Sequence, residues 1–210
     1  AGHYDDARLY IDKLKEKQMP PGRIAFLEGL LASSRSQYHE AIKQWQDAIN
    51  SGSDSPQVTM LLANALQQVG NSQQALQRLR ELVNRRPQMP GARMALAQAL
   101  ADNGSLSEAA EHIRQVLQRY PDNFQARLLY NRILMRSAAA NQDNAAALQE
   151  IEANLEDLRQ QSADSLELSM MRLQLLMTKG ELDKAHELIA RLQQEHPSNM
   201  ELQLEKANVL

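Results

Sequence analysis

The side chains that could carry catalysis or hold a metal ion are spread thinly along this chain. Its five histidines lie on separate turns, at positions 3, 39, 112, 186 and 196, and no two have the four-residue spacing with which a helix binds zinc. Neighbouring carboxylates, such as Glu150 with Glu152, have the spacing of a solvated helix face. Cysteine, a phosphate-binding glycine loop and a nucleophile elbow are all absent. We therefore predict no enzyme activity, no cofactor and no metal site.

The elements that would position any functional residue recur with a fixed period. Alanine appears at positions 7, 41, 75 and 109, which are evenly spaced. Small residues recur in phase at 29, 63 and 97, glycines at 2, 70 and 104, and prolines at 87 and 121. Small residues let two helices approach closely, glycine accepts the positive φ that ends a helix, and proline stops the next one. Such a period predicts stacked helix pairs that share a continuous core.

This pattern resembles the tetratricopeptide-repeat family, whose unit is a helix–turn–helix of about 34 residues. Gly180, Ala185 and Pro197 repeat it once more, so the resemblance covers nearly the whole chain. It implies an all-α fold, a right-handed α-solenoid of antiparallel helix pairs. The expected helices lie near residues 3–17, 22–34, 37–51, 56–69, 72–86, 90–103, 106–119, 123–139, 143–161, 164–178, 181–195 and 198–210.

The repeat spacing is uneven in the second half of the chain. Two further repeats after Ala109 would place an anchor at position 177, but the next clear anchor is Ala185. Ala147 divides this longer interval equally, which predicts one extra helical turn in each of two repeats, at residues 137–140 and before Lys179. We expect a single array, residues 1–210, with a half repeat at 1–19, repeats at about 20–53, 54–87, 88–121, 122–161 and 162–197, and a half repeat at 198–210.

Neither end of the array has the polar cap that a solenoid needs, and Ala207 falls where the small residue of a further repeat belongs. We therefore expect a segment of a longer protein, and the uncapped ends could pair with those of a second molecule.

The resemblance implies that the first helix of each repeat lines a concave groove for a partner protein or peptide. Rows of apolar, amide and charged residues with the repeat spacing would face that groove. Alternatively, the apolar row simply packs between helices. The predicted groove residues are Phe26, Met60, Asn64, Gln67, Met94, Gln98, Asp102, Leu128, Arg132 and Arg136.

Charge and composition narrow the classes of partner. Residues 71–141 carry ten basic and five acidic side chains, whereas residues 142–210 carry six and thirteen. This gradient indicates either solvated helix faces or a basic middle that meets an acidic partner. Basic residues form no continuous tract and aromatics are only 4%, so we expect no nucleic-acid partner. No stretch approaches the roughly 18 apolar residues of a membrane span.

The family's best-known peptide readers hold a carboxylate with Lys and Asn residues. The matching positions here are Leu30, Asn64, Gln98 and Arg132, so no such clamp is expected. Repeats rich in Gln and Arg look more like bacterial members that serve envelope assembly, secretion or exopolysaccharide export, which implies a periplasmic or envelope location. Two alternatives remain: a substrate-docking or regulatory arm of an enzyme whose catalytic domain lies outside this segment, and a groove for polysaccharide.

Overall fold

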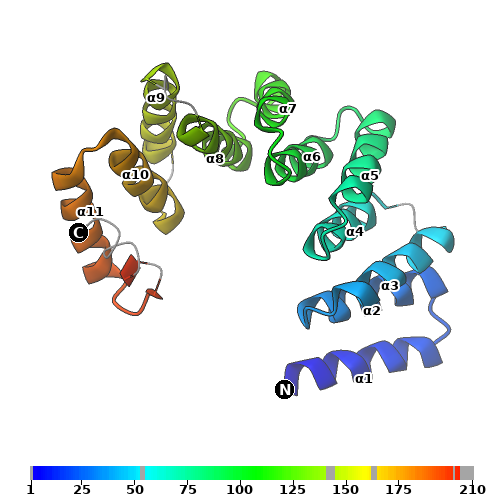
Figure 1. Cartoon of the computed structure of the whole chain (residues 1–210). Coiled ribbons are helices and arrows are strands. Elements are labelled where there is room, and N and C mark those ends of the chain that lie inside the picture. Colours follow the sequence, from blue (N-terminus) through cyan, green and yellow to red (C-terminus); the bar gives the residue numbers. More distant parts are fainter. Residues whose placement is uncertain (1, 53–54, 141–144, 162–164, 201, 204–210) are drawn as a thin grey trace. The chain divides into compact units, whose positions relative to one another are not determined.

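The computed structural model describes residues 2–52, 55–140, 145–161, 165–200 and 202–203. These residues form eleven α-helices and no strand (Figure 1). The predicted all-α fold, a solenoid of helix pairs, is confirmed. The expected helix at 198–210, with Ala207, falls largely outside the described residues. The helices are α1 (Gly2–Glu16), α2 (Pro21–Ser34), α3 (Tyr38–Asn50), α4 (Pro56–Gln68), α5 (Ser72–Arg85), α6 (Pro90–Asp102), α7 (Leu106–Arg119), α8 (Phe124–Ala140), α9 (Ala145–Gln161), α10 (Leu166–Lys179) and α11 (Leu182–Glu195).

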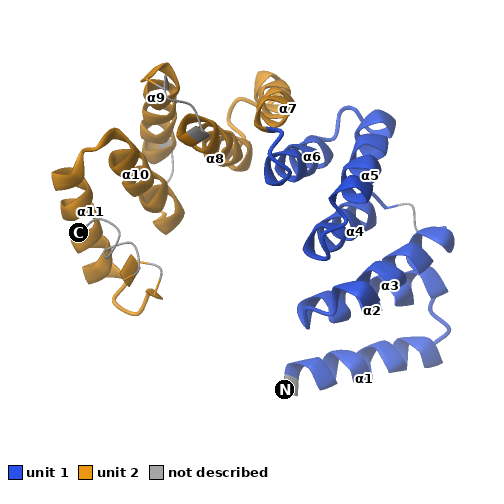
Figure 2. Ribbon diagram, in the orientation of Figure 1, with its two compact units in different colours: residues 1–105 blue, residues 106–210 orange. Residues whose placement is uncertain are grey.

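The chain divides into two compact units, residues 1–105 and 106–210 (Figure 2). Unit 1 contains α1 to α6 and unit 2 contains α7 to α11. Within each unit, every helix packs against the next one along the chain. First helices of neighbouring repeats also touch, α4 with α6 in unit 1 and α8 with α10 in unit 2. Side chains on these first helices can therefore form a shared surface within a unit.

The second helix of each repeat supplies three buried residues to the core, at an anchor position and four and seven residues later. This spacing places them on one helix face. In α1 the matching Ala7 and Leu14 are only half-buried, and Ile11 alone is buried. The buried sets are Ala41, Trp45 and Ala48; Ala75, Leu79 and Leu82; Ala109, Ile113 and Val116; Ile151, Leu155 and Leu158; and Ala185, Ile189 and Leu192.

The described turns inside the repeats have a left-handed residue one or two positions after the first helix. Gly70, Gly104 and Gly180 fill this position with φ of 78°, 83° and 73°. In the first repeat the same position holds Ser36, with φ of 58°. A side chain in this region is strained, because its Cβ crowds the backbone. The first repeat therefore keeps the turn at a conformational cost that the second, third and fifth repeats avoid.

The additional residues all lie in the fourth repeat, so the prediction of two stretched repeats is wrong. The buried anchor of α9 is Ile151, whereas Ala147 is half-buried. The spacing from Ile151 to Ala185 is that of an ordinary repeat, and the whole excess lies between Ala109 and Ile151. Both α8 and α9 have 17 residues, against 13 or 14 in α4 to α7, and α10 has 14. One hairpin has thus been extended at its tip, and the fifth repeat has ordinary length.

Small residues mark the crossing of the two helices in unit 1. Gly29 lies against the buried Trp45 of α3, and a Cβ added there would come within 2.3 Å of the indole Nε1. That indole N–H donates to the Phe26 carbonyl oxygen at 3.3 Å. Ala63 and Ala97 occupy the same position in the next two repeats and are fully buried. In the first two repeats, α2 with α3 and α4 with α5 can approach closely because no larger side chain separates them.

The same position in the fourth repeat holds a polar residue, Asn131, which lies one repeat after Ala97, and in the fifth repeat it holds the buried Leu173. The Asn131 side chain is 0% exposed. Its Oδ1 accepts a hydrogen bond from Asn154 Nδ2 of α9 at 3.1 Å, while its own Nδ2 has no partner among the described residues. A buried amide without its full set of hydrogen bonds is costly. The fourth repeat therefore departs from the others both in length and in its helix contact.

Candidate functional site

The predicted apolar row is not equally accessible in the two units. Phe26, Met60 and Met94 are half-buried on α2, α4 and α6 of unit 1. Leu128 of α8, in unit 2, is only 1% exposed. Its side chain therefore packs inside unit 2, as the alternative interpretation of this row describes, whereas the other three still present surface.

The predicted polar residues lie on exposed parts of the same helices. In unit 1, Asn64 is exposed and Gln67 half-buried on α4, and Gln98 Nε2 of α6 donates to Asp102 Oδ1 at 2.9 Å. In unit 2, Arg132 and Arg136 are exposed on α8, one turn apart. The predicted surface thus has one part in unit 1 and one part in unit 2.

A groove of about 820 Å³ in unit 2 lies on these first helices. It runs between α8 and α10, and its lining is mainly methionine and leucine with a few polar side chains. We call it the α8–α10 groove. Of the predicted site residues it contains Arg132 alone. Its lining residues are Arg132, Met135, Leu166, Glu167, Met170, Met171, Leu173, Gln174, Met177 and Thr178.

An ion pair joins the two walls of the α8–α10 groove. Arg132 Nη2 donates to Glu167 Oε1 at 2.7 Å. Both side chains are about half exposed, 47% and 48%, so water screens the pair and its net contribution to stability is at most about 1 kcal/mol. A partner group could replace either half of this pair at little cost.

Sequence reasoning missed the α10 wall of the groove, although the repeat register could have found it. Met170 is the fifth residue of α10, just as Met60 is of α4 and Met94 of α6. Gln174 likewise matches Asn64, the ninth residue of its helix. Counting from the starts of the first helices extends each predicted row into the fifth repeat. The predicted rows of groove residues end at α8 and so omit α10.

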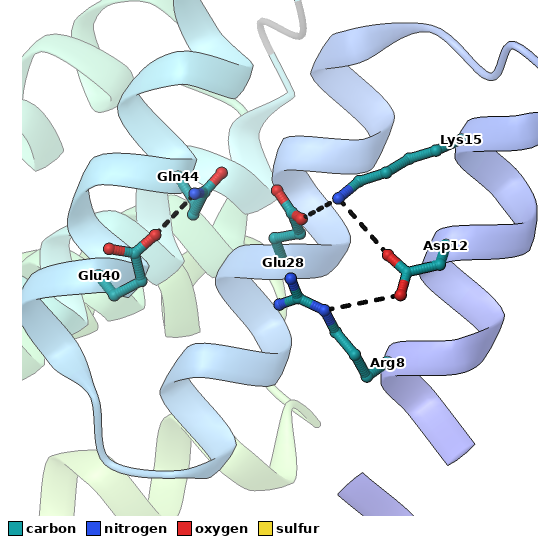
Figure 3. Close-up of polar contacts among 6 residues, drawn as sticks. All are labelled: Arg8, Asp12, Lys15, Glu28, Glu40 and Gln44. Carbon is teal, nitrogen blue, oxygen red and sulfur yellow. Dashed lines mark hydrogen bonds and ion pairs between the residues drawn. The ribbon is translucent and has the colours of Figure 1, made fainter. Parts of the chain in front are cut away.

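A second polar cluster lies in unit 1 between α1, α2 and α3 (Figure 3). Lys15 Nζ lies 2.7 Å from Glu28 Oε1 and 3.7 Å from Asp12 Oδ1, and Arg8 Nε lies 3.9 Å from the same Asp12 carboxylate. Its hollow measures about 150 Å³, too small for a ligand pocket. The charges already pair with one another, so this cluster fastens α1 to α2.

Hydrogen-bonded charges also tie the helices of unit 2 together. Tyr130 of α8 donates its hydroxyl to Glu150 Oε1 of α9 at 2.9 Å and accepts from Arg114 Nε of α7 at 3.0 Å. Burial, followed by the bond to Glu150, raises the pKa of the Tyr130 hydroxyl. It therefore remains a neutral donor. Lys179 of α10 reaches Glu152 of α9 at 2.9 Å, and its bonds to Glu181 and Glu152 raise the pKa of its ammonium group. These contacts position the helices that line the groove.

The described residues contain no group of three or more side chains placed to hold a metal ion. None of their helices is long and apolar enough to cross a membrane. What the α8–α10 groove can do is bind: methionines adapt their shape to apolar side chains, and the ion pair and amide orient polar groups.

Comparisons with known proteins agree with the repeat fold. A family model described as tetratricopeptide repeat matches residues 60–124. No curated protein matches the chain in sequence.

Solved structures share the fold at low sequence identity. A thermophilic tetratricopeptide-repeat protein from Thermus thermophilus is 19% identical, with a TM-score of 0.70 over 90% of this chain and 98% of that one. PilW, a type IV pilus biogenesis factor, is 15% identical with a TM-score of 0.76, over 96% and 90%. YrrB, described as having an unusual peptide-binding site, is 19% identical with a TM-score of 0.58, over 81% and 84%.

Proteins of this fold are typically non-catalytic and generally mediate protein–protein interaction. Residues 60–124 thus match the tetratricopeptide repeat in sequence, and most of the chain shares the fold of solved tetratricopeptide-repeat structures.

Proposed function

We propose that this chain is a non-catalytic scaffold that binds a segment of a partner protein, anchored in the α8–α10 groove. The observation that carries the proposal is the position of the groove. Met170 and Gln174 occupy the same places on α10 that the repeat register assigns to partner contact on α4 and α6. A cavity on those positions supports their use as a binding surface.

The size and lining of the groove suit a short peptide segment. Its volume, about 820 Å³, is within the roughly 300–1,000 Å³ of ligand pockets. Met135, Met170 and Met177 offer flexible apolar walls that accept side chains of varied shape. Arg132 and Glu167 can pair with charged groups at the rim, and the amide of Gln174 can pair with a peptide group.

The first helices of unit 1 supply further contacts in this proposal. Met60 and Met94 would contact apolar side chains of the partner, with Asn64, Gln67, Gln98 and Asp102 beside them and Phe26 at the first repeat. In unit 2, Arg132 and Arg136 would meet its acidic groups, while Leu128 is buried and would not contact the partner. A long partner would use both units, whereas a short peptide needs only the α8–α10 groove.

We also propose that the partner belongs to a bacterial multiprotein assembly at the cell envelope. The fold likeness to PilW, a type IV pilus biogenesis factor, supports this context. The peptide-binding site described for YrrB supports a peptide as the ligand class. Both are likenesses of fold, so the partner itself has to be found by experiment.

A selection from a random peptide display library tests the binding role. The whole chain is the bait, and enriched peptides are compared on two variants, Gln174→Arg and Asn64→Arg, which place the same bulky cation at matching helix positions. We expect peptides with large apolar side chains whose affinity falls at least about tenfold on Gln174→Arg and little on Asn64→Arg. Enrichment of no peptide, or of peptides indifferent to Gln174→Arg, would contradict the proposal.

A further inference from the structure

Helix α1 carries an unusual concentration of exposed apolar surface. Leu9 and Tyr10 are 56% and 62% exposed, and among the described large apolar side chains only Met200 is more exposed. Scattered apolar residues on a surface need no explanation, but adjacent large ones on a single helix indicate a contact surface. The matching positions on α3, α5 and α7 are all polar: Lys43 and Gln44, Gln77 and Arg78, and Glu111 and His112.

Charged residues flank this apolar pair symmetrically. Asp6, Leu9, Tyr10 and Lys13 are spaced i, i+3, i+4 and i+7, so all four lie on one face of α1. Ile11 is buried toward α2 on the other side, and Figure 1 shows α1 beside α2 at the N-terminal edge of unit 1. All four side chains are exposed. Neither the Asp6 carboxylate nor the Lys13 ammonium pairs with another side chain in the part of the chain that the structure describes.

This face is complementary to itself. Its midpoint lies between Leu9 and Tyr10, with the negative charge one turn before and the positive charge one turn after. If a second copy packs antiparallel across a two-fold axis at that midpoint, Asp6 of each copy faces Lys13 of the other and Leu9 faces Tyr10. A parallel arrangement would instead place like charges together. A two-fold interface requires this self-complementarity.

We propose that α1 is a homodimerisation surface on which two copies of this chain pack their α1 helices antiparallel through Asp6, Leu9, Tyr10 and Lys13. The occupant is a second copy because the charge pattern matches the chain's own reversed pattern. A single helix pair makes a small interface, so the association is weak and depends on concentration. The partner-binding groove in unit 2 takes no part in it.

Sedimentation equilibrium on the whole chain tests the proposal with a charge-reversal design. The native chain should move from 23.7 kDa toward twice that mass as its concentration rises to about 1 mM. Asp6→Lys alone and Lys13→Asp alone each place like charges opposite one another, so each variant should associate at least about tenfold more weakly. An equimolar mixture of the two restores both opposite-charge pairs and should associate again.

All these positions are exposed, so the variants should fold, and circular dichroism would verify this. A native chain that stays at 23.7 kDa up to about 1 mM overturns the proposal. Single reversals that associate as well as the native chain also overturn it, as does a mixture that stays monomeric. Tyr10→Gln, which installs the residue of the matching position on α3, should weaken association in the same assay, and unchanged association would argue against this face.

Discussion

Unit 1 and unit 2 build the same helix pair around different residues at one position. In unit 1 this position holds Gly29, Ala63 or Ala97, and in unit 2 it holds the buried amide of Asn131 in the fourth repeat and the buried Leu173 in the fifth. The repeat with Asn131 is also the extended one, and its first helix forms one wall of the α8–α10 groove. The comparison shows that the helix pair is kept when the small residue at this position is replaced, and we propose that the fourth repeat contributes to a binding surface.

The largest expected effect comes from moving the unit 2 residue into unit 1. Ala97→Asn would bury an amide in a fully buried site built for a methyl group, and we expect a loss of about 2–4 kcal/mol of unfolding free energy. The reverse change, Asn131→Ala, removes an unsatisfied donor and should cost less than about 1 kcal/mol. Urea unfolding followed by circular dichroism measures both. Equal losses would show that the two crossings are packed alike.

Gly29→Ala tests the tight crossing directly. The added Cβ would lie 2.3 Å from Nε1 and 2.5 Å from Cδ1 of Trp45, which is buried and cannot turn away. We expect a net loss of about 1–3 kcal/mol. Trp45, the only tryptophan of the chain, lets fluorescence report unfolding of unit 1. Gly91→Ala is the matched control, because its nearest contact would be 3.9 Å away, and it should be neutral or slightly stabilising.

A smaller effect is expected at the turn of the first repeat. Ser36→Gly relieves a left-handed φ of 58° and should raise the unfolding free energy by about 0.5–1 kcal/mol. Gly180→Ser makes the opposite change in unit 2 and should lower it by a similar amount. Thermal unfolding of the two variants would check both signs. A destabilising Ser36→Gly would mean that the serine side chain contributes more than its strain costs.

The smallest expected effect is an acid sensitivity of unit 2. Hydrogen bonds from Arg159, and to a smaller extent from Gln160, lower the pKa of Glu156 to about 2. Hydrogen bonds from Lys179, and to a smaller extent from Lys184, lower the pKa of Glu181 to about 2. Because the folded values lie below the ordinary 4.5, the contribution is present above pH 4.5 and is lost as the pH falls toward 2. Both side chains are partly exposed to water, which screens these pairs and keeps the effect small.

Hydrogen exchange measured between pH 5 and pH 3, and corrected for the intrinsic rate, should show α9 to α11 losing protection. The double variant Glu156→Gln and Glu181→Gln should show a smaller pH dependence there. An identical pH dependence in the variant and the native chain would show that these ion pairs do not cause the acid sensitivity of unit 2.

The repeat register predicted much of the fold because each marker residue has one mechanical task. Gly70 and Gly104 end first helices, Pro87 and Pro121 follow second helices, and Ala75 and Ala109 sit where helices touch. The register failed in the fourth repeat because its anchor, Ile151, is not alanine, while the alanines at 145–147 imitate one. Burial identifies the anchor, and a residue type only suggests it.

Repeat spacing predicts at which helix positions the candidate site lies, but it does not predict how deeply each side chain is buried. Arg132 lines the α8–α10 groove, but the sequence pattern treated the buried Leu128 as equivalent to the half-buried Met60 and Met94. Whether such a residue is covered depends on how its neighbours pack, which repeat spacing does not encode. The α8–α10 groove depends on packing in the same way, since α8 is extended and α10 is not.

Methyl NMR on the nine methionines tests the central claim, that a partner peptide is anchored in unit 2, most directly. The chain is labelled at its methionine methyl groups and titrated with a peptide from the display selection. We expect the methyl signals of Met135, Met170 and Met177 to shift with a common affinity, while those of Met60 and Met94, on α4 and α6 of unit 1, stay nearly unchanged. Shifts at Met60 and Met94 with none at Met170 would contradict it.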